Sequence, residues 1–223
     1  MRRNVPLFIC LIAAVTLAGV SSLIYEVLWI RQLGFALGST AVATSIMLTA
    51  FLGGLAIGSM IMGKYADALV NPFSSLVVVE ILAAMTGLAS IPALAYAGRA
   101  YVLITTATGL TGFWAMILRS LFALIIMAIP AIMFGMTFPL ATVIGTRLIG
   151  GQTAAGTVSA ASSFGSAIGA LVCGLWLEPT IGIFASAQVA AILNLCAAFL
   201  VAIAGFCFRR RTESTNSRIL HGK

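Results

Sequence analysis

Long apolar stretches alternate with short polar segments along most of this chain. A membrane-spanning helix needs about 20 consecutive, mostly apolar residues, and six windows of that kind occur. They cover approximately residues 6–30, 41–62, 72–96, 121–144, 153–177 and 181–208. The pattern therefore predicts an all-α membrane protein, with a six-helix transmembrane domain over residues 1–208 and a basic cytoplasmic tail over residues 209–223.

Composition supports this prediction. Apolar residues make up 61% of the 223 residues and charged residues only 8%, too few to cover a water-soluble surface. The first window has an alternative interpretation as a signal peptide, because Arg2 and Arg3 precede it and the segment "LAGVSS" resembles a cleavage site. Its apolar stretch continues to Ile30, which exceeds the roughly 7–15 residues of a signal-peptide core, so we expect a retained helix.

The stretch at residues 98–120 is only half apolar. It is expected to form either an interfacial helix or an early start to the fourth span.

The distribution of lysine and arginine predicts an orientation. With six spans both termini share one side, which collects Arg2, Arg3, Lys64, Arg147, Arg209, Arg210, Arg211, Arg218 and Lys223, whereas the other side holds Arg31 and Arg99, with Arg119 at its edge. Cytoplasmic loops carry the excess of basic residues, so both termini are expected in the cytoplasm, at a bacterial-type inner membrane. Topology and the lipid bilayer account for the net charge of +7, and no nucleic-acid partner is expected.

One phrase occurs twice in the chain. The segments "GLAIGSMIMGKYAD" (residues 54–67) and "GSAIGALVCGLWLE" (residues 165–178) share five identical residues at an offset of 111, and Asp67 matches Glu178 as an acid. The copies occupy the second span of each group of three, and because three is odd, the second group enters the membrane in the opposite direction. This predicts a 3+3 inverted repeat, the architecture of half a major-facilitator-like bundle, with Asp67 facing the cytoplasm and Glu178 the periplasm.

Small residues recur every four positions in both copies. They form rows for helix packing: Ala50, Gly54 and Gly58 in the second span, and Ala161, Gly165 and Gly169 in the fifth. Residues four apart share a helix face, and rows of small residues let helices in a bilayer approach closely. Two alternatives follow. The rows pack inside the monomer, or they meet a second six-helix half, most simply in a two-fold homodimer.

Soluble-enzyme chemistry has no candidate residues in this sequence. The four cysteines lie inside predicted helices without a CxxC spacing, and His221 stands alone in the polar tail. No nucleophile and base, metal motif or phosphate-binding loop is recognisable. We therefore expect no catalytic residue, no metal and no cofactor, and no catalytic activity from this chain by itself.

Ionisable side chains inside membrane spans are costly, which makes them candidates for function. Glu80 lies eight residues after Pro72, so it is expected near the middle of the third span. It is either a substrate or proton site or an acid satisfied by a neighbouring hydroxyl. Asn194, near the centre of the sixth span, is expected to form hydrogen bonds between helices, and the alternative is a substrate or proton site.

Glu26 lies near the outer end of the first span, beside Tyr25 and Trp29. One interpretation places all three in an interfacial aromatic belt, with Glu26 paired to one of the three arginines on that side. The alternative is a mouth that attracts a cation, since a carboxylate flanked by aromatic faces suits an ammonium ligand.

Three segments resemble the membrane region of fused major-facilitator/spermidine-synthase-like proteins. "SSLIYEVLWIRQLGFALGST" and the residues up to "GKYAD" resemble its opening, "IPAIMFGMTFPLATVIG" its fourth helix, and "SAASSFGSAIGALVCGLWLEPTIG" its fifth helix and following turn. The resemblance implies a transport or membrane-partner component for a small organic cation such as a polyamine. Ser162 departs from the pattern, because members of that family commonly carry Asn there.

That family usually continues into a soluble aminopropyltransferase-like domain, whereas 15 residues follow Phe208 here. The resemblance therefore implies that a separate cytosolic aminopropyltransferase or methyltransferase supplies any chemistry. As the alternative to transport, the chain is a membrane anchor or scaffold that holds such an enzyme through Lys64, Arg147 and the basic tail.

Overall fold

Six α-helices follow one another in the computed structural model, which describes residues 4–221. They are α1 (Val5–Leu37), α2 (Thr40–Tyr65), α3 (Pro72–Thr108), α4 (Gly112–Ile149), α5 (Gly151–Val172) and α6 (Glu178–His221). A 3-10 turn, η2 (Ala66–Ala68), follows α2, and a π-helical turn, η3 (Cys173–Leu177), joins α5 to α6. The described residues contain no strand, which confirms the prediction of an all-α protein.

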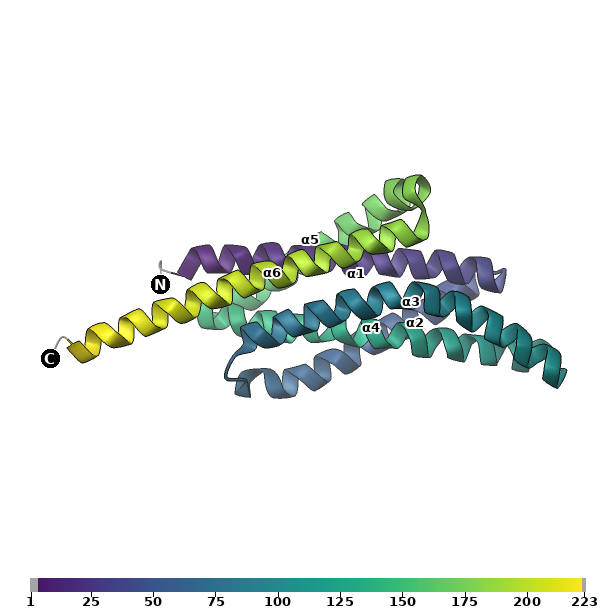
Figure 1. Cartoon of the computed structure of the whole chain (residues 1–223), viewed down its shortest axis with the longest axis horizontal. Coiled ribbons are helices and arrows are strands. Elements are labelled where there is room, and N and C mark those ends of the chain that lie inside the picture. The colour runs from purple at the N-terminus through teal and green to yellow at the C-terminus, as the bar shows by residue number, and fades with distance from the viewer. Residues whose placement is uncertain (1–3, 222–223) are drawn as a thin grey trace.

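Five helical segments are long and apolar enough to cross a membrane: Val5–Phe35, Ala41–Ala68, Pro72–Thr108, Gly112–Ile149 and Gly151–Arg211. These segments make the chain a multi-pass membrane protein. The last one, of 61 residues, contains α5, η3 and the apolar part of α6. Within it Gly182 has φ 79° and ψ 173°, which is not a helical conformation, and the chain turns back in this region (Figure 1).

The stretch at residues 98–120 forms the tip of a helical hairpin. Helix α3 continues through it to Thr108, and α4 begins at Gly112. Gly109 ends α3 with a left-handed φ of 68°, a conformation that glycine adopts without steric cost. The early start of the fourth helix is thus present, whereas the long extension of the third helix was not expected.

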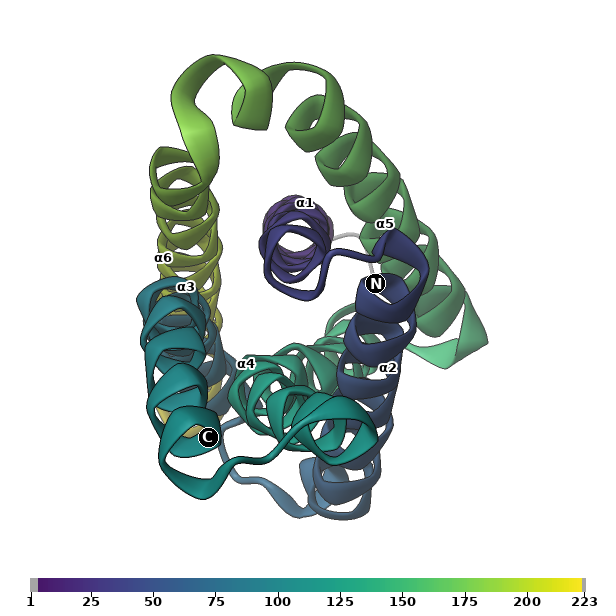
Figure 2. The same ribbon diagram turned by 90° about the vertical axis from the view of Figure 1, so that its right-hand side faces the viewer.

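Helix α1 lies in the middle of the bundle, with the other five helices around it (Figure 2). It contacts all five of them. Helix α2 packs mainly on α4, α5 on α1, and α3 on both α4 and α6. The start of α1, the α2–α3 and α4–α5 connections and the far part of α6 lie at one end (Figure 1), which we call the terminal end. The other three connections lie at the opposite end.

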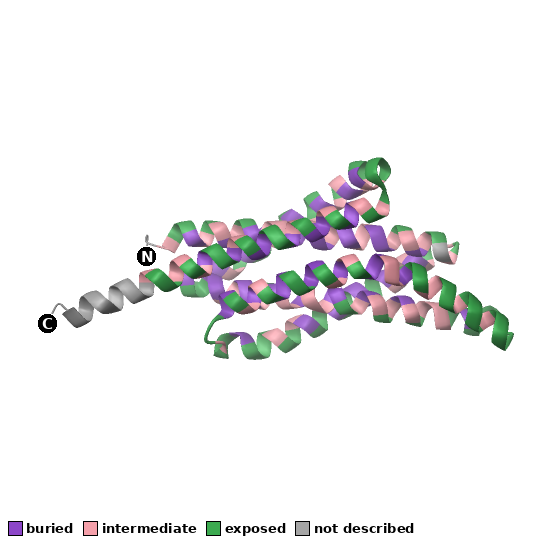
Figure 3. Ribbon diagram, viewed as in Figure 1, coloured by how far each residue is buried: buried purple, intermediate pink, exposed green. Residues whose placement is uncertain are grey.

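Buried apolar side chains form two clusters along the length of the bundle. The terminal cluster includes residues between Leu7 and Ala18 of α1, and the distal cluster includes residues between Ile24 and Leu33. Figure 3 shows the buried positions along the inner faces of the helices and exposed residues at the tip of the α3–α4 hairpin. The core is therefore interrupted at mid-length.

The first glycine row lies against α4. A Cβ added to Gly54 would be 3.1 Å from the backbone nitrogen of Ile132, and one added to Gly58 would be 3.0 Å from the carbonyl carbon of the same residue. Gly135 of α4 makes the reciprocal contact, because a Cβ there would meet Cα of Leu55 at 2.8 Å. Ala50, the first member of the row, is buried in the distal cluster.

The second glycine row lies against α1 in the same manner. A Cβ on Gly165 would be 2.9 Å from the carbonyl carbon of Thr16, and a Cβ on Gly169 would be 2.8 Å from Cα of Val20. Ala161 belongs to the terminal cluster. Both rows are thus buried within one chain, which is the first of the two alternatives; neither row is left open as the contact surface for a second copy.

Close packing at the glycine rows predicts that substitutions there destabilise the protein more than substitutions of glycines outside the rows. Gly58→Ala and Gly169→Ala are expected to lower the free energy of unfolding by about 1–3 kcal/mol, because the added methyl overlaps a neighbouring backbone. Gly63→Ala and Gly156→Ala place the methyl where no atom lies within 4 Å, and alanine favours a helix by about 1 kcal/mol, so these controls should be neutral or stabilising. Unfolding by sodium dodecyl sulfate in mixed micelles measures the effect. Equal losses in both pairs would contradict the packing.

Candidate functional site

A layer of buried polar side chains lies between the two apolar clusters. We call it the middle layer, and it consists of Ser21 and Ser22 on α1, Glu80 on α3, Thr137 on α4 and Asn194 on α6. On α3, for example, the terminal cluster ends at Val79 and the distal cluster begins at Ala83. Lipid tails offer no hydrogen-bond partner to polar groups at this depth, so such groups mark a candidate site.

Glu80 is the acid of the middle layer and is only 2% exposed. The Thr137 hydroxyl donates a hydrogen bond of 2.9 Å to its Oε1, whereas Oε2 has no hydrogen-bond partner. No described lysine or arginine forms an ion pair with Glu80, so no protein cation neutralises it. A buried carboxylate without a cation is costly, and a proton or a bound cation would remove that cost.

Asn194 is fully buried. Neither its Oδ1 nor its Nδ2 has a hydrogen-bond partner among the described residues, so the interhelical bond expected from the sequence is not formed. An unsatisfied buried amide costs about 1–3 kcal/mol, and such groups in native proteins generally have an unseen partner such as water or an ion. The side chain thus offers donors and an acceptor at mid-depth.

A pocket of about 230 Å³ lies between α1, α2, α4 and α5. Hydroxyl groups line it from four helices: Ser22, Ser59, Thr137, Ser162 and Ser166. Aromatic side chains of Phe51, Phe134 and Phe138 complete the wall. Thr137 belongs both to this pocket and to the hydrogen bond with Glu80. The threonine therefore connects the buried carboxylate to the pocket.

Sequence reasoning missed most of these hydroxyls. It singled out Ser162, but not Ser59 beside Gly58 or Ser166 one turn after Ser162. The available signal was position, because serines adjoining a close-packed glycine row lie at the edge of the helix contact. Ser59 donates a 2.8 Å bond to the carbonyl oxygen of Gly135.

Tyr25 and Trp29 lie in the core and have 0% exposure. The Tyr25 hydroxyl donates to the Ala187 carbonyl on α6 at 3.1 Å, and Trp29 Nε1 donates to Ser90 Oγ on α3 at 2.8 Å. Their rings stack with centroids 6.0 Å apart. Both sequence interpretations of these two residues, an interfacial belt and a cation mouth, were therefore wrong; the pair holds α1 to its neighbours.

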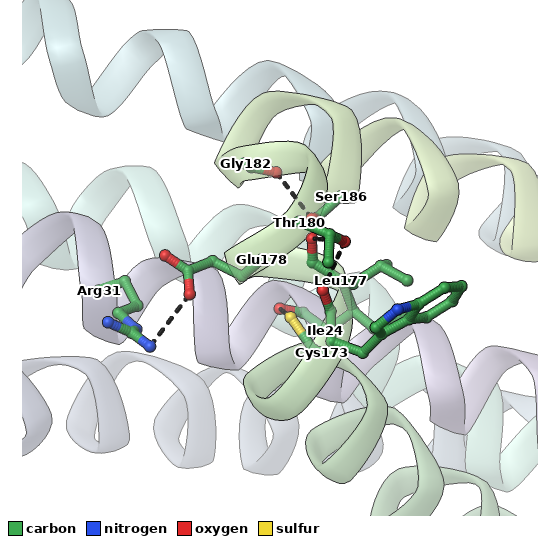
Figure 4. Close-up of polar contacts among 9 residues, drawn as sticks. Ile24, Arg31, Cys173, Leu177, Glu178, Thr180, Gly182 and Ser186 are labelled. Atoms are coloured by element: carbon green, nitrogen blue, oxygen red, sulfur yellow. Dashed lines mark hydrogen bonds and ion pairs between the residues drawn. The ribbon is translucent and has the colours of Figure 1, made fainter.

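Glu26 is half-buried, and the ion pair expected for it is not formed among the described residues. Arg31 instead pairs with Glu178 at 3.0 Å (Figure 4), because the turn after α5 brings that carboxylate over the end of α1. Arg99 and Arg119 lie over tyrosine rings of α3. Glu26 has no hydrogen bond or ion pair within the described residues, and it lies outside the middle layer.

The turn between α5 and α6 is shown in Figure 4. The Cys173 thiol lies 3.8 Å from the Ile24 carbonyl oxygen on α1. Thr180 and Ser186 donate to backbone carbonyls one turn earlier, those of Trp176 and Gly182. Both are bonds of a hydroxyl to the carbonyl four residues earlier, a common pattern for Ser and Thr inside helices.

The second loop acid, Asp67, lies in η2 at the terminal end. Nη2 of Arg147, near the end of α4, donates to the backbone oxygens of Asp67 and Leu69 at 3.2 and 3.0 Å. The connection after α2 is therefore fixed by an arginine through its backbone, whereas Glu178 binds an arginine through its carboxylate.

The described residues contain no group of three or more His, Cys, Asp or Glu side chains that could hold a metal ion. Comparison of the chain with models of protein families, with curated proteins and with solved structures found no match. Any functional conclusion therefore depends on the middle layer and its pocket.

Proposed function

We propose that this chain is a six-span component of a membrane transporter for a small organic cation, built as a 3+3 inverted repeat. Helix packing supports the repeat. If α1, α2 and α3 are exchanged with α4, α5 and α6, the contact of α2 with α4 becomes that of α5 with α1, and the contact of α3 with α4 becomes that of α6 with α1. Each of these contacts is extensive, as expected for half of a major-facilitator-like bundle.

Individual residues support the same exchange. Arg31 near the end of α1 binds Glu178 after α5, and Arg147 near the end of α4 binds the loop of Asp67 after α2. These are the two acids matched by the sequence repeat. Helix α5 packs on α1, and Arg31 of α1 binds the connection after α5. Helix α2 packs on α4, and Arg147 of α4 binds the connection after α2.

Length supports separate crossings by α5 and α6. Helix α5 has 22 residues, about 33 Å at 1.5 Å per residue, which matches a hydrocarbon core about 30 Å thick. Helix α6 is longer still, at 44 residues. With six crossings, the excess of basic residues at the terminal end supports a cytoplasmic location of both termini, at a bacterial-type inner membrane.

Reporter fusions test this topology. A fluorescent protein fused after Val70 or at the C-terminus should be fluorescent, because both sites lie on the cytoplasmic side. Alkaline phosphatase inserted at Leu110, in the α3–α4 turn, should be active, because that enzyme folds in the periplasm. If alkaline phosphatase fused at the C-terminus were active, and a fluorescent protein fused there were not fluorescent, the topology would be contradicted.

The observation that carries the transport proposal is Glu80, an acid without a cationic partner beside a hydroxyl-lined pocket. An ammonium group donates up to three hydrogen bonds and needs acceptors. Thr137, Ser162 and Ser166 offer hydroxyl oxygens, and the carboxylate offers the opposite charge. A polyamine-like cation fits this chemistry, and a proton on Glu80 in the empty state would keep the layer neutral between binding events.

The position of the pocket favours a second protein that covers its open side. It is lined from α2 and α5 as well as α1 and α4, and polar surface at this depth is tolerated only against protein or a water-filled cavity. A homodimer, or a different six-helix protein as the second half, would cover it. Because the glycine rows are buried within the chain, this contact would use exposed apolar residues such as Leu52, Met60, Phe164 and Leu171.

Ligand binding by the wild type and by Glu80→Gln tests the proposal. Spermidine or putrescine should raise the melting temperature of the wild type. In Glu80→Gln the affinity should fall by about 30-fold or more, because removal of one member of a buried charge pair costs at least about 2 kcal/mol. Glu26→Gln is the matched control, since it removes the same charge outside the middle layer and should bind normally.

Absence of any ligand effect in all three proteins would exclude cation transport. The anchor alternative would then remain, in which a cytosolic aminopropyltransferase or methyltransferase binds at Lys64, Arg147 and the basic tail. Under that alternative, loss of these basic residues would release the enzyme from the membrane, whereas Glu80→Gln would not.

A further inference from the structure

At the terminal end, α3 and α6 leave a groove of about 780 Å³ that the transport proposal does not use. Phe73 and Val77 of α3 line one side, Gly205 and Phe206 of α6 line the other, and Arg147 and Arg209 complete it. Phe73 also stacks on Phe208 with ring centroids 5.5 Å apart. The groove is thus formed where the starting turns of α3 pack on α6.

Polar and apolar groups are ordered along this groove. On α6 its lining runs from Ala202 to Arg209, about 10 Å along a helix axis, with the arginine at the outer end. On the other side it runs from Asn71, just before α3, through Ser74 inward to Val78 of α3. Val78 and Phe206 are exposed, at 54% and 58%. A ligand in this groove would need a polar head at the outer end and an apolar part directed into the bilayer.

Charge identifies the head as an anion. No acid is among the residues that line the groove in the described part of the chain, whereas both of its charged residues are arginines. Lys64, Arg210 and Arg211 lie at the same end, where the acids are Asp67 and Glu213, so basic residues are in excess there. Arginine binds phosphate oxygens through paired N–H donors, and basic residues at this level attract anionic lipids.

We propose that the groove binds an anionic glycerophospholipid from the leaflet at the terminal end. The phosphate lies between Arg147 and Arg209, and an acyl chain lies along Val78 and Phe206. Because Arg147 also holds the backbone of the α2–α3 connection, the bound headgroup joins that connection to α6. This inference is independent of the cation site at Glu80.

Native mass spectrometry of the full chain tests the proposal after incubation with equal amounts of phosphatidylglycerol and phosphatidylcholine. Two arginines near the headgroup should favour phosphatidylglycerol by about 30-fold. Arg147→Gln with Arg209→Gln should remove most of this preference. Arg99→Gln with Arg119→Gln is the matched control, because it removes the same charge at the opposite end and should retain the preference.

A second variant separates the groove from general surface attraction. Ala202→Trp fills the apolar part and leaves every arginine in place, so it should lose the bound lipid. Phosphatidylglycerol retained by Ala202→Trp but lost from the double arginine variant would overturn the proposal, since the lipid would then be attracted by surface charge alone. Equal retention of both lipids by the wild type would also overturn it. Glu80→Gln should bind lipid normally, which keeps this test separate from that of transport.

Discussion

Backbone contact at glycine is the constraint on which the rest of this bundle depends. In a bilayer, lipid tails are as apolar as leucine, so helices associate through close packing and polar contacts rather than through exclusion of water. Gly54 and Gly58 bring α2 onto α4, and Gly165 and Gly169 bring α5 onto α1. These two contacts leave α1 in the centre of the bundle and fix which face each helix presents to the interior.

The polar middle layer lies beside these contacts. Between the four helices that the glycine rows bring together lies the hydroxyl-lined pocket, and the apolar core divides into two clusters at mid-length. Glu80 and Asn194 lie at this division with polar atoms unsatisfied. Such groups reduce stability, because nothing described in the chain compensates them. A site that binds a cation or a proton gives a physical reason for their presence.

Depth along a helix could be predicted from the sequence, but the face of the helix and its partners could not. The apolar windows located the helices, and the repeated phrase located the glycines that make the closest contacts. Tyr25 and Trp29 were misplaced because an aromatic residue near the end of a span fits both an interfacial belt and a buried core. Only the packing shows that α1 is surrounded by other helices, so that these side chains are buried. The partner of Arg31 was missed because Glu178 is remote in sequence, and the π-helical turn that presents it has no sequence signature. Asn194 was located, but its lack of a partner is a property of its neighbours.

Cation transport requires that the hydroxyl-lined pocket is hydrated at mid-membrane and admits a cation. Cysteine accessibility tests it most directly, in a variant without the native cysteines and in intact membranes. Ser59→Cys and Ser166→Cys should react with a positively charged methanethiosulfonate reagent, because a thiolate forms only where water reaches it. Ile57→Cys and Ile168→Cys, on exposed apolar positions of the same helices, should not react. Unreactive pocket cysteines, or equal rates at all four positions, would contradict the account.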